Sequence, residues 1–189
     1  MARRHRVGLA MAVGIATAAC QPDPGDVPRL DALRQPTGLA VGPAGRTLFV
    51  TNGNWDREQT DSTLMAVDLD RLFAELERPG PAGDRSRPCR EVSEDDSTLE
   101  CRPSAFVDAR ATVRLGTGAG NIGVDRPTGA DGPVRLLVPT RSPASVTWLD
   151  VVADDDGVML DCDQDDDQRC GADHEIQASA SSRLPGEPA

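Results

Sequence analysis

The stretch PTGLAVGPAGRTLFVTNGNWDREQTDSTLMAVDL, residues 36–69, decides the fold because it predicts three short strands separated by two turns. Residues 38–41 form a short apolar run, and the Gly-Pro-Ala-Gly of residues 42–45 interrupts it. Residues 46–51 are rich in β-branched and aromatic side chains, which suit a pleated strand. A third strand is expected over residues 63–69. All three runs are too short for helices, so the stretch predicts an antiparallel sheet.

The same order of elements returns, more loosely, between Gly120 and Val151. The corresponding parts are residues 121–124 with the first strand, 127–133 (PTGADGP) with the turn, 135–138 with 47–50, and 145–150 with 63–68. A single small sheet cannot bury both of its faces alone. The repeat therefore predicts two sheets that stack on each other.

This order of motifs resembles the YVTN-type β-propeller repeat, with residues 49–52 (FVTN) in place of the tetrapeptide that names it. The second copy departs from the family, because residues 137–140 are LVPT, without Asn and with a proline. The resemblance covers residues 36–69 and 119–151. It implies an all-β fold of antiparallel, blade-like sheets and a partial β-propeller, since propellers typically have about 4–8 blades. The alternative is a generic antiparallel meander.

The N-terminus predicts an address in the cell envelope. Residues 1–19 have a basic start and an apolar run that is too short to cross a bilayer as a mature helix, and they predict a signal peptide. The ending Ala-Ala-Cys20 resembles the lipobox of bacterial lipoproteins, although Thr17 stands where Leu is usual. This resemblance implies cleavage before Cys20 and its acylation, for example with palmitate. Gln21 at the next position implies the outer membrane. The alternative is an ordinary secretory signal.

The composition limits the classes of function. The formal net charge is −11, and a chain without the three arginines of residues 1–19 carries −14. Such an acidic protein repels nucleic acid, so no nucleic-acid partner is expected. Every basic residue other than histidine is arginine, which excludes lysine Schiff-base chemistry. The partner expected from the sequence is the membrane, through the lipid anchor, and a protein or small-molecule partner is not identified.

Four segments are expected. Residues 1–19 form the signal peptide, and residues 20–35 tether the lipidated cysteine to the domain. Residues 36–177 form the propeller-like domain, with an insertion at about 70–110 that lengthens the first repeat. Residues 178–189 are small and polar and are expected to be disordered.

Within the insertion, residues 70–77 predict a helix because their apolar side chains fall on one face. Residues 105–107 and 111–115 are expected to give the outermost strand of the first sheet. The glycine-rich residues 116–120 superficially resemble a phosphate-binding loop. Neither Lys-Ser/Thr nor a helix follows them, so they predict a crossing between the two sheets.

The remaining cysteines, Cys89, Cys101, Cys162 and Cys170, are even in number, which favours disulfides in an exported chain. Three connectivities are possible. The local one, Cys89–Cys101 with Cys162–Cys170, closes two short loops, each worth roughly 2.5–3 kcal/mol, and staples insertions that lack a core. The rival is a metal site of cysteine and His174, which the absence of any Cys-x-x-Cys pair disfavours.

A calcium site is the sharpest candidate for ligand binding. Asp161, Asp163 and Asp165 place carboxylates at alternate positions, as calcium loops do. An EF-hand loop beginning at Asp161 needs glycine at its sixth position and glutamate at its twelfth, where Asp166 and Ala172 stand. A solvated acidic loop is therefore the favoured interpretation, and weak calcium binding is the alternative.

The sequence thus predicts a lipid-anchored cell-envelope protein with a β-propeller-like binding or scaffolding module. Some proteins with YVTN-like propellers resemble lactonases or quinoprotein dehydrogenases, so a fragment of a propeller enzyme is the alternative. Fold alone is a weak basis for activity. The chain after residue 19 has one histidine, His174, with no Lys, no Tyr and no Gly-x-Ser-x-Gly motif, which argues against an enzyme.

Overall fold

The computed structural model describes residues 25–56, 58–126, 133–154 and 157–177, and most of them lie in antiparallel strands. The first sheet has the strand order β1-β2-β3-β6, with the bounds Pro36–Val41, Thr47–Asn52, Ser62–Asp68 and Val107–Leu115. All of its neighbouring strands are antiparallel. The strands expected in the first repeat are confirmed, as is an outermost strand at the end of the insertion.

The second sheet has the order β10-β9-β8-β7, again antiparallel throughout. The bounds, in chain order, are β7 Gly123–Asp125, β8 Val134–Arg141, β9 Ala144–Asp154 and β10 Gly157–Asp161, and β11, Glu175–Gln177, pairs with the start of β9. The first sheet is therefore a four-stranded meander and the second is a five-stranded sheet built on a meander of the same kind, which confirms the predicted antiparallel all-β class. The described residues do not close into a barrel or a propeller, and the propeller identity stays a prediction.

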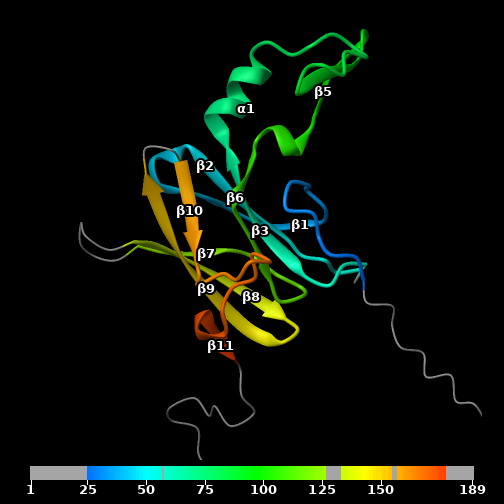
Figure 1. Cartoon of the computed structure of the whole chain (residues 1–189). Helices are drawn as coiled ribbons and strands as arrows, with labels where there is room; N and C mark the ends of the chain where they lie inside the picture. Colours follow the sequence, from blue (N-terminus) through cyan, green and yellow to red (C-terminus); the bar gives the residue numbers. More distant parts are fainter. Residues whose placement is uncertain (1–24, 57, 127–132, 155–156, 178–189) are drawn as a thin grey trace, which may run out of the picture.

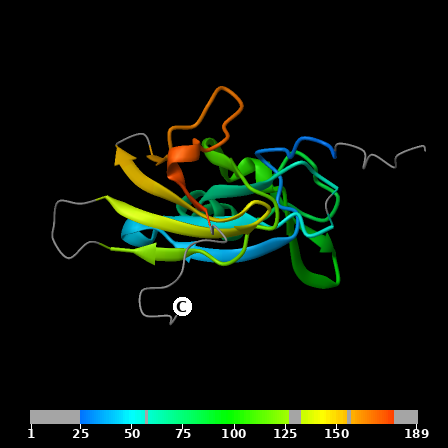
Figure 2. The same cartoon turned by 90° about the horizontal axis from the view of Figure 1, so that it is seen from below.

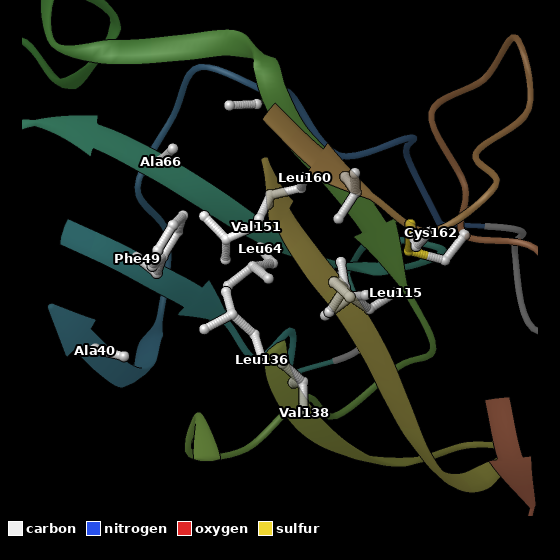
Figure 3. Close-up of a cluster of buried hydrophobic side chains, with 14 of the residues drawn as sticks. Ala40, Phe49, Leu64, Ala66, Leu115, Leu136, Val138, Val151, Leu160 and Cys162 are labelled. Atoms are coloured by element: carbon white, nitrogen blue, oxygen red, sulfur yellow. A yellow bond between two sulfur atoms is a disulfide. The ribbon is translucent and has the colours of Figure 1, made fainter. Parts of the chain in front are cut away.

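The two sheets pack face to face around the main hydrophobic core. Phe49 and Leu64 of the first sheet point toward Leu136 and Val151 of the second sheet (Figure 3), and all four are 5% exposed or less. Burial of each such side chain stabilises the fold by about 1.5–3 kcal/mol. The core thus lies between the sheets, as the repeat predicts.

The sheets stack head to tail, which means that the two faces in contact are not the faces that correspond under the sequence repeat. Under the sequence correspondence, Phe49 matches Leu137 and Ala66 matches Trp148. Phe49 and Ala66 face the second sheet. Leu137 and Trp148 are cross-strand partners that alternate with core residues, so they face away from the first sheet. We call the side of these four residues the front of each sheet and the opposite side its back. The front of the first sheet packs on the back of the second.

The insertion covers the back of the first sheet. Helix α1, Leu69–Leu76, begins at Asp68, whose side chain accepts a hydrogen bond from the Arg71 amide. The helix directs Leu72 and Leu76 toward a second apolar cluster that contains Val50, Val67, Cys89 and Phe106. The helix predicted for residues 70–77 is confirmed. A hairpin of β4, Cys89–Ser93, and β5, Asp96–Cys101, lies with α1 at one end of the molecule (Figure 1).

The described part of the predicted tether also packs on the first sheet. The Asn52 side chain accepts a hydrogen bond from the Arg34 amide at 3.0 Å and donates one to the Ala32 carbonyl at 3.2 Å. Asp26 pairs with Gln59 in a parallel bridge. Residues 25–35 therefore follow the sheet instead of hanging from it.

The loop after β10, drawn in orange in Figure 2, joins the second sheet back to the first. The Arg114 amide in β6 donates to the Gln168 carbonyl at 2.7 Å, and the Arg169 guanidinium lies 2.5 Å from Asp61. Residues 116–120 form the predicted crossing between the two sheets. They contain no helix, and Thr117 forms a bridge with Ser142 of the second repeat. No helix of the described residues has the length and apolar character needed to cross a bilayer.

Candidate binding face on the second sheet

The front of the second sheet carries a stacked set of polar and aromatic side chains. Arg135 and Asp150 are cross-strand partners on β8 and β9, and they form two hydrogen bonds, of 2.8 Å from Nε and 3.1 Å from Nη2. The hydrogen bonds that Arg135 donates to Asp150 raise the pKa of Arg135 above its usual value. The same guanidinium lies over the ring of Trp148, 4.3 Å from its centroid. The Arg135 guanidinium is therefore held both by the Asp150 carboxylate and by the Trp148 ring.

His174 extends the stack on Trp148. The two rings are 3.7 Å apart at an interplanar angle of 25°, and the His174 side chain is buried. Its Nδ1 lies 2.9 Å from the Trp148 carbonyl oxygen. Because a carbonyl only accepts, Nδ1 carries the proton and donates. Nε2 lies 3.3 Å from the Asp163 carboxylate. His174 thus holds the C-terminal loop against the sheet, and it is not exposed for acid–base chemistry.

Apolar side chains surround this stack. Val152 is 39% exposed, Met159 49% and Ile176 62%, and Leu137 and Val146 are partly buried on the same front. They come from β8, β9, β10 and β11. The front of the second sheet thus exposes apolar side chains on either side of a cross-strand row of charged residues, Asp125, Arg135, Asp150 and Asp161. Exposed apolar side chains gathered on one face are typical of a contact surface.

The three aspartates of the predicted calcium site do not converge. One Asp161 carboxylate oxygen accepts from the Asp163 amide at 3.4 Å, and one from Asp165 accepts from the Asp167 and Arg169 amides at 3.0 and 2.9 Å. Among the residues that the structure describes, no three His, Cys, Asp or Glu side chains come close enough to hold a metal ion. Calcium binding stays a prediction, and these contacts give it no support.

Both local disulfides are present, which confirms one of the three connectivities left open by the sequence. Cys89 and Cys101 face each other across β4 and β5, with their Cα atoms 4.1 Å apart. Cys162 and Cys170 have Cα atoms 5.1 Å apart and belong to the main core. The second disulfide is therefore not the staple of a coreless insertion. The predicted lipidation site Cys20, the signal peptide at 1–19 and the tail at 178–189 lie outside the described residues.

Two cavities lie at the ends of the first sheet. One, of about 360 Å³, is lined by Gln35, Asn52, Asn54 and Asp56 among others. Two of its amide side chains bind the protein itself. Asn54 exchanges hydrogen bonds with the Gln59 backbone at 2.6 and 3.1 Å. The Gln35 side chain donates to Asp56 and accepts from the Trp55 backbone amide. The Gln35 and Asn54 amides are therefore committed to contacts within the protein.

The other cavity, of about 330 Å³, lies between the sheets and is lined by Asp68, Asp70, Asp108 and apolar residues. Asp68 caps α1, Asp70 pairs with Arg46 at 2.5 Å, and Asp108 pairs with Arg110 at 3.1 Å. Asp68 and Asp150, which occupy corresponding positions in the two repeats, both have structural contacts: Asp68 caps a helix and Asp150 binds Arg135.

The front of the second sheet was not predicted from the sequence. Arg135, Trp148 and Asp150 are visible in the sequence, but they meet only once the register of β8 on β9 is known. The alternation of core and non-core residues along β9 was the available signal. Comparison of the chain with protein-family models, with curated proteins and with solved structures finds no match.

Proposed function

We propose that this protein is a lipid-anchored component of the cell envelope, placed at the outer membrane, and that it works by binding or scaffolding rather than by catalysis. The observation that carries the binding role is the open front of the second sheet. It exposes Val152, Met159 and Ile176 around an ion pair that is already satisfied. A contact surface of this kind gains free energy when it is covered, because apolar area leaves water.

The contacts of the polar residues support a non-catalytic role. His174 is stacked and buried, and the three aspartates of the inter-sheet cavity each have a partner within the protein. General acid–base catalysis needs a titratable group within reach of a substrate, and these groups are committed to the fold. The head-to-tail stacking of two equivalent meanders supports the propeller-like interpretation of the repeat.

The proposed lipid anchor is tested by intact-mass spectrometry of the protein recovered from the membrane fraction of a Gram-negative host. We expect a chain that lacks residues 1–19, carries acyl chains on Cys20 and has four hydrogens fewer than the reduced form, one pair for each disulfide. The control is Cys20→Ser, which removes the acceptor thiol and leaves every described residue unchanged. We expect this variant to be exported without acyl groups. A soluble, unacylated wild-type protein would contradict the anchor.

A further inference from the structure

We propose that the cavity between the sheets binds a small organic cation, namely a guanidinium group on a short alkyl chain. The cavity has a volume of about 330 Å³. It is lined by Thr47, Ala66 and Asp68 of the first sheet and by Ala153 and Val158 of the second. This volume is at the lower end of the range for small-molecule sites. The site is separate from the front of the second sheet and independent of the lipid anchor.

The repeat shows which chemical group this cavity lacks. Arg135 and Asp150 are cross-strand partners in the second sheet, and the guanidinium donates hydrogen bonds of 2.8 and 3.1 Å to the carboxylate. Thr47 and Asp68 are the equivalent cross-strand partners in the first sheet. Threonine brings no cation to this position. A guanidinium from outside the chain can therefore lie beside Asp68 as the Arg135 guanidinium lies beside Asp150.

Asp68 has one carboxylate oxygen to offer to such a cation. Its Oδ1 caps α1 by accepting a hydrogen bond from a backbone amide at 3.0 Å. Among the described residues, no hydrogen bond reaches its Oδ2 and no arginine forms an ion pair with it. The other carboxylates of the cavity do have arginine partners. Asp70 pairs with Arg46 at 2.5 Å, and Asp108 pairs with Arg110 at 3.1 Å.

Thr47 adds an unused hydroxyl to the wall of the cavity. Its side chain is on the same side of β2 as Phe49, so it points between the sheets, and the residue is only 8% exposed. In the part of the chain that the structure describes, its hydroxyl forms no hydrogen bond. A bound donor would satisfy this group. Because Thr47 and Asp68 are cross-strand partners, the N–H groups of one guanidinium can contact both.

The other walls leave room for an alkyl chain rather than a metal ion. Ala66 stands where the second repeat has Trp148, and the cavity is also lined by Ala153 and Gly157. A Cβ atom at Gly157 would lie 3.8 Å from an Asp108 carboxylate oxygen, so the glycine keeps this side open. Within the described residues, no three His, Cys, Asp or Glu side chains come close enough to hold a metal ion. The cavity thus favours an organic cation.

The test is isothermal titration calorimetry with butylguanidinium as the probe and the full chain carrying Cys20→Ser, which changes no described residue. We expect a dissociation constant of about 0.1–1 mM. Butylurea has the same shape without the charge and should bind about 10-fold more weakly or worse. N-acetylargininamide carries the same group on a peptide unit. Equal affinity for it would identify an arginine side chain as the natural ligand, and weaker affinity a free small guanidine.

Three variants locate the site. Asp68→Asn removes the charge but keeps the cap of α1, because asparagine caps helices as well as aspartate does, and it should weaken butylguanidinium binding about 10-fold or more. Thr47→Arg supplies an internal guanidinium and should abolish binding. The matched control is Glu77→Gln, which removes the same charge at the exposed opposite end of α1 and should leave the affinity unchanged. Far-UV circular dichroism checks the fold of each variant.

The proposal would be overturned by a chain that does not bind butylguanidinium at millimolar concentration or by equal affinity for butylurea. It would also be overturned if Asp68→Asn bound the probe as tightly as the parent chain, or if Glu77→Gln weakened binding as much as Asp68→Asn, which would indicate attraction by the overall charge. None of these outcomes bears on the acylation of Cys20 or on the front of the second sheet.

Discussion

The two sheets share the same path of four antiparallel strands and the same sequence repeat, yet their faces are buried to different extents. The central strands β2 and β3 of the first sheet are covered on both sides, and in β3 the first six residues, from Ser62 to Val67, are all buried. The second sheet is covered along its back, whereas on its front His174 covers Trp148 and Met159 is half exposed. Equivalent positions therefore face either a core or an open surface. A repeated sequence pattern fixes which way a side chain points but not what it meets.

The largest difference should appear at the pair Phe49 and Leu137, which occupy equivalent front positions. Phe49→Ala is expected to lower the free energy of unfolding by about 3–5 kcal/mol, because the ring is fully buried between the sheets. Leu137→Ala should lower it by about 1 kcal/mol, because its side chain is only partly buried. Urea denaturation with the disulfides intact measures both values. Equal losses would show that the two fronts are equally covered.

The two disulfides should also differ. Removing the core bridge with Cys162→Ala and Cys170→Ala is expected to lower the free energy of unfolding by about 3–5 kcal/mol. This bridge holds the loop that pairs with Arg114 and Asp61. Removing the hairpin bridge with Cys89→Ala and Cys101→Ala should lower it by about 2–3 kcal/mol. Thermal unfolding of the two double variants compares them, and the reverse order would contradict the structural role given to the loop.

Asn52 holds the 25–35 segment on the back of the first sheet. Its replacement by alanine removes the hydrogen bonds to Arg34 and Ala32 and should lower the free energy of unfolding by about 1–3 kcal/mol. Trypsin cleavage at Arg34 should accelerate as the 25–35 segment detaches. Thr140 is the equivalent residue in the second sheet and binds the Pro143 carbonyl at 2.9 Å and Ser145 at 2.8 Å. Thr140→Ala should leave the cleavage rate at Arg34 unchanged.

The smallest expected effect is on the pH dependence of stability, through Asp108 in the cavity between the sheets. Burial alone would raise the pKa of Asp108, but its hydrogen bonds from Arg110 outweigh burial and lower it. A carboxyl whose pKa is lowered by folding stabilises the protein above its unfolded pKa of about 3.9, and this stability disappears as the pH falls through the lowered value. Asp108→Asn should therefore reduce stability by less than about 1 kcal/mol at pH 7 and by nothing at low pH.

The control for this pH dependence is Asp95→Asn in the exposed turn between β4 and β5. Chemical denaturation at neutral and acidic pH should give parallel curves for this variant and the wild type. A variant at Asp108 that loses as much stability in acid as at neutral pH would contradict the role given to its carboxylate.

Strong local patterns explain what the sequence predicted correctly. The runs at 38–41, 46–51 and 63–69 combine β-branched residues with clear turn signals, and they form β1, β2 and β3. The helix after Asp68 follows from its apolar spacing and from its capping side chain. The even number of cysteines favoured disulfides, and the structure shows the local pairing among the three that the sequence left open.

Elements held by distant contacts were missed. The β4–β5 hairpin is polar, and its pairing is fixed by the Cys89–Cys101 bridge rather than by a hydrophobic run. Strand β10 contains only three consecutive apolar residues, Val158, Met159 and Leu160, between acidic stretches. It is a strand because Leu160 fills the inter-sheet core. The candidate binding face was missed for the same reason, since its residues come together only through the register of β8 on β9.

The ion pair of Arg169 with Asp61 joins residues 108 positions apart, and this separation has a consequence for the order of folding. Contacts between hairpin neighbours close short loops and form early, whereas a contact across so long a segment must wait until loop-closure entropy is offset by other structure. The C-terminal loop should therefore dock last, after both meanders exist. Until it does, the edge of β6 is an unpaired strand edge that can template pairing with another chain. Docking of the C-terminal loop thus covers part of the β6 edge and removes one site at which another chain could pair.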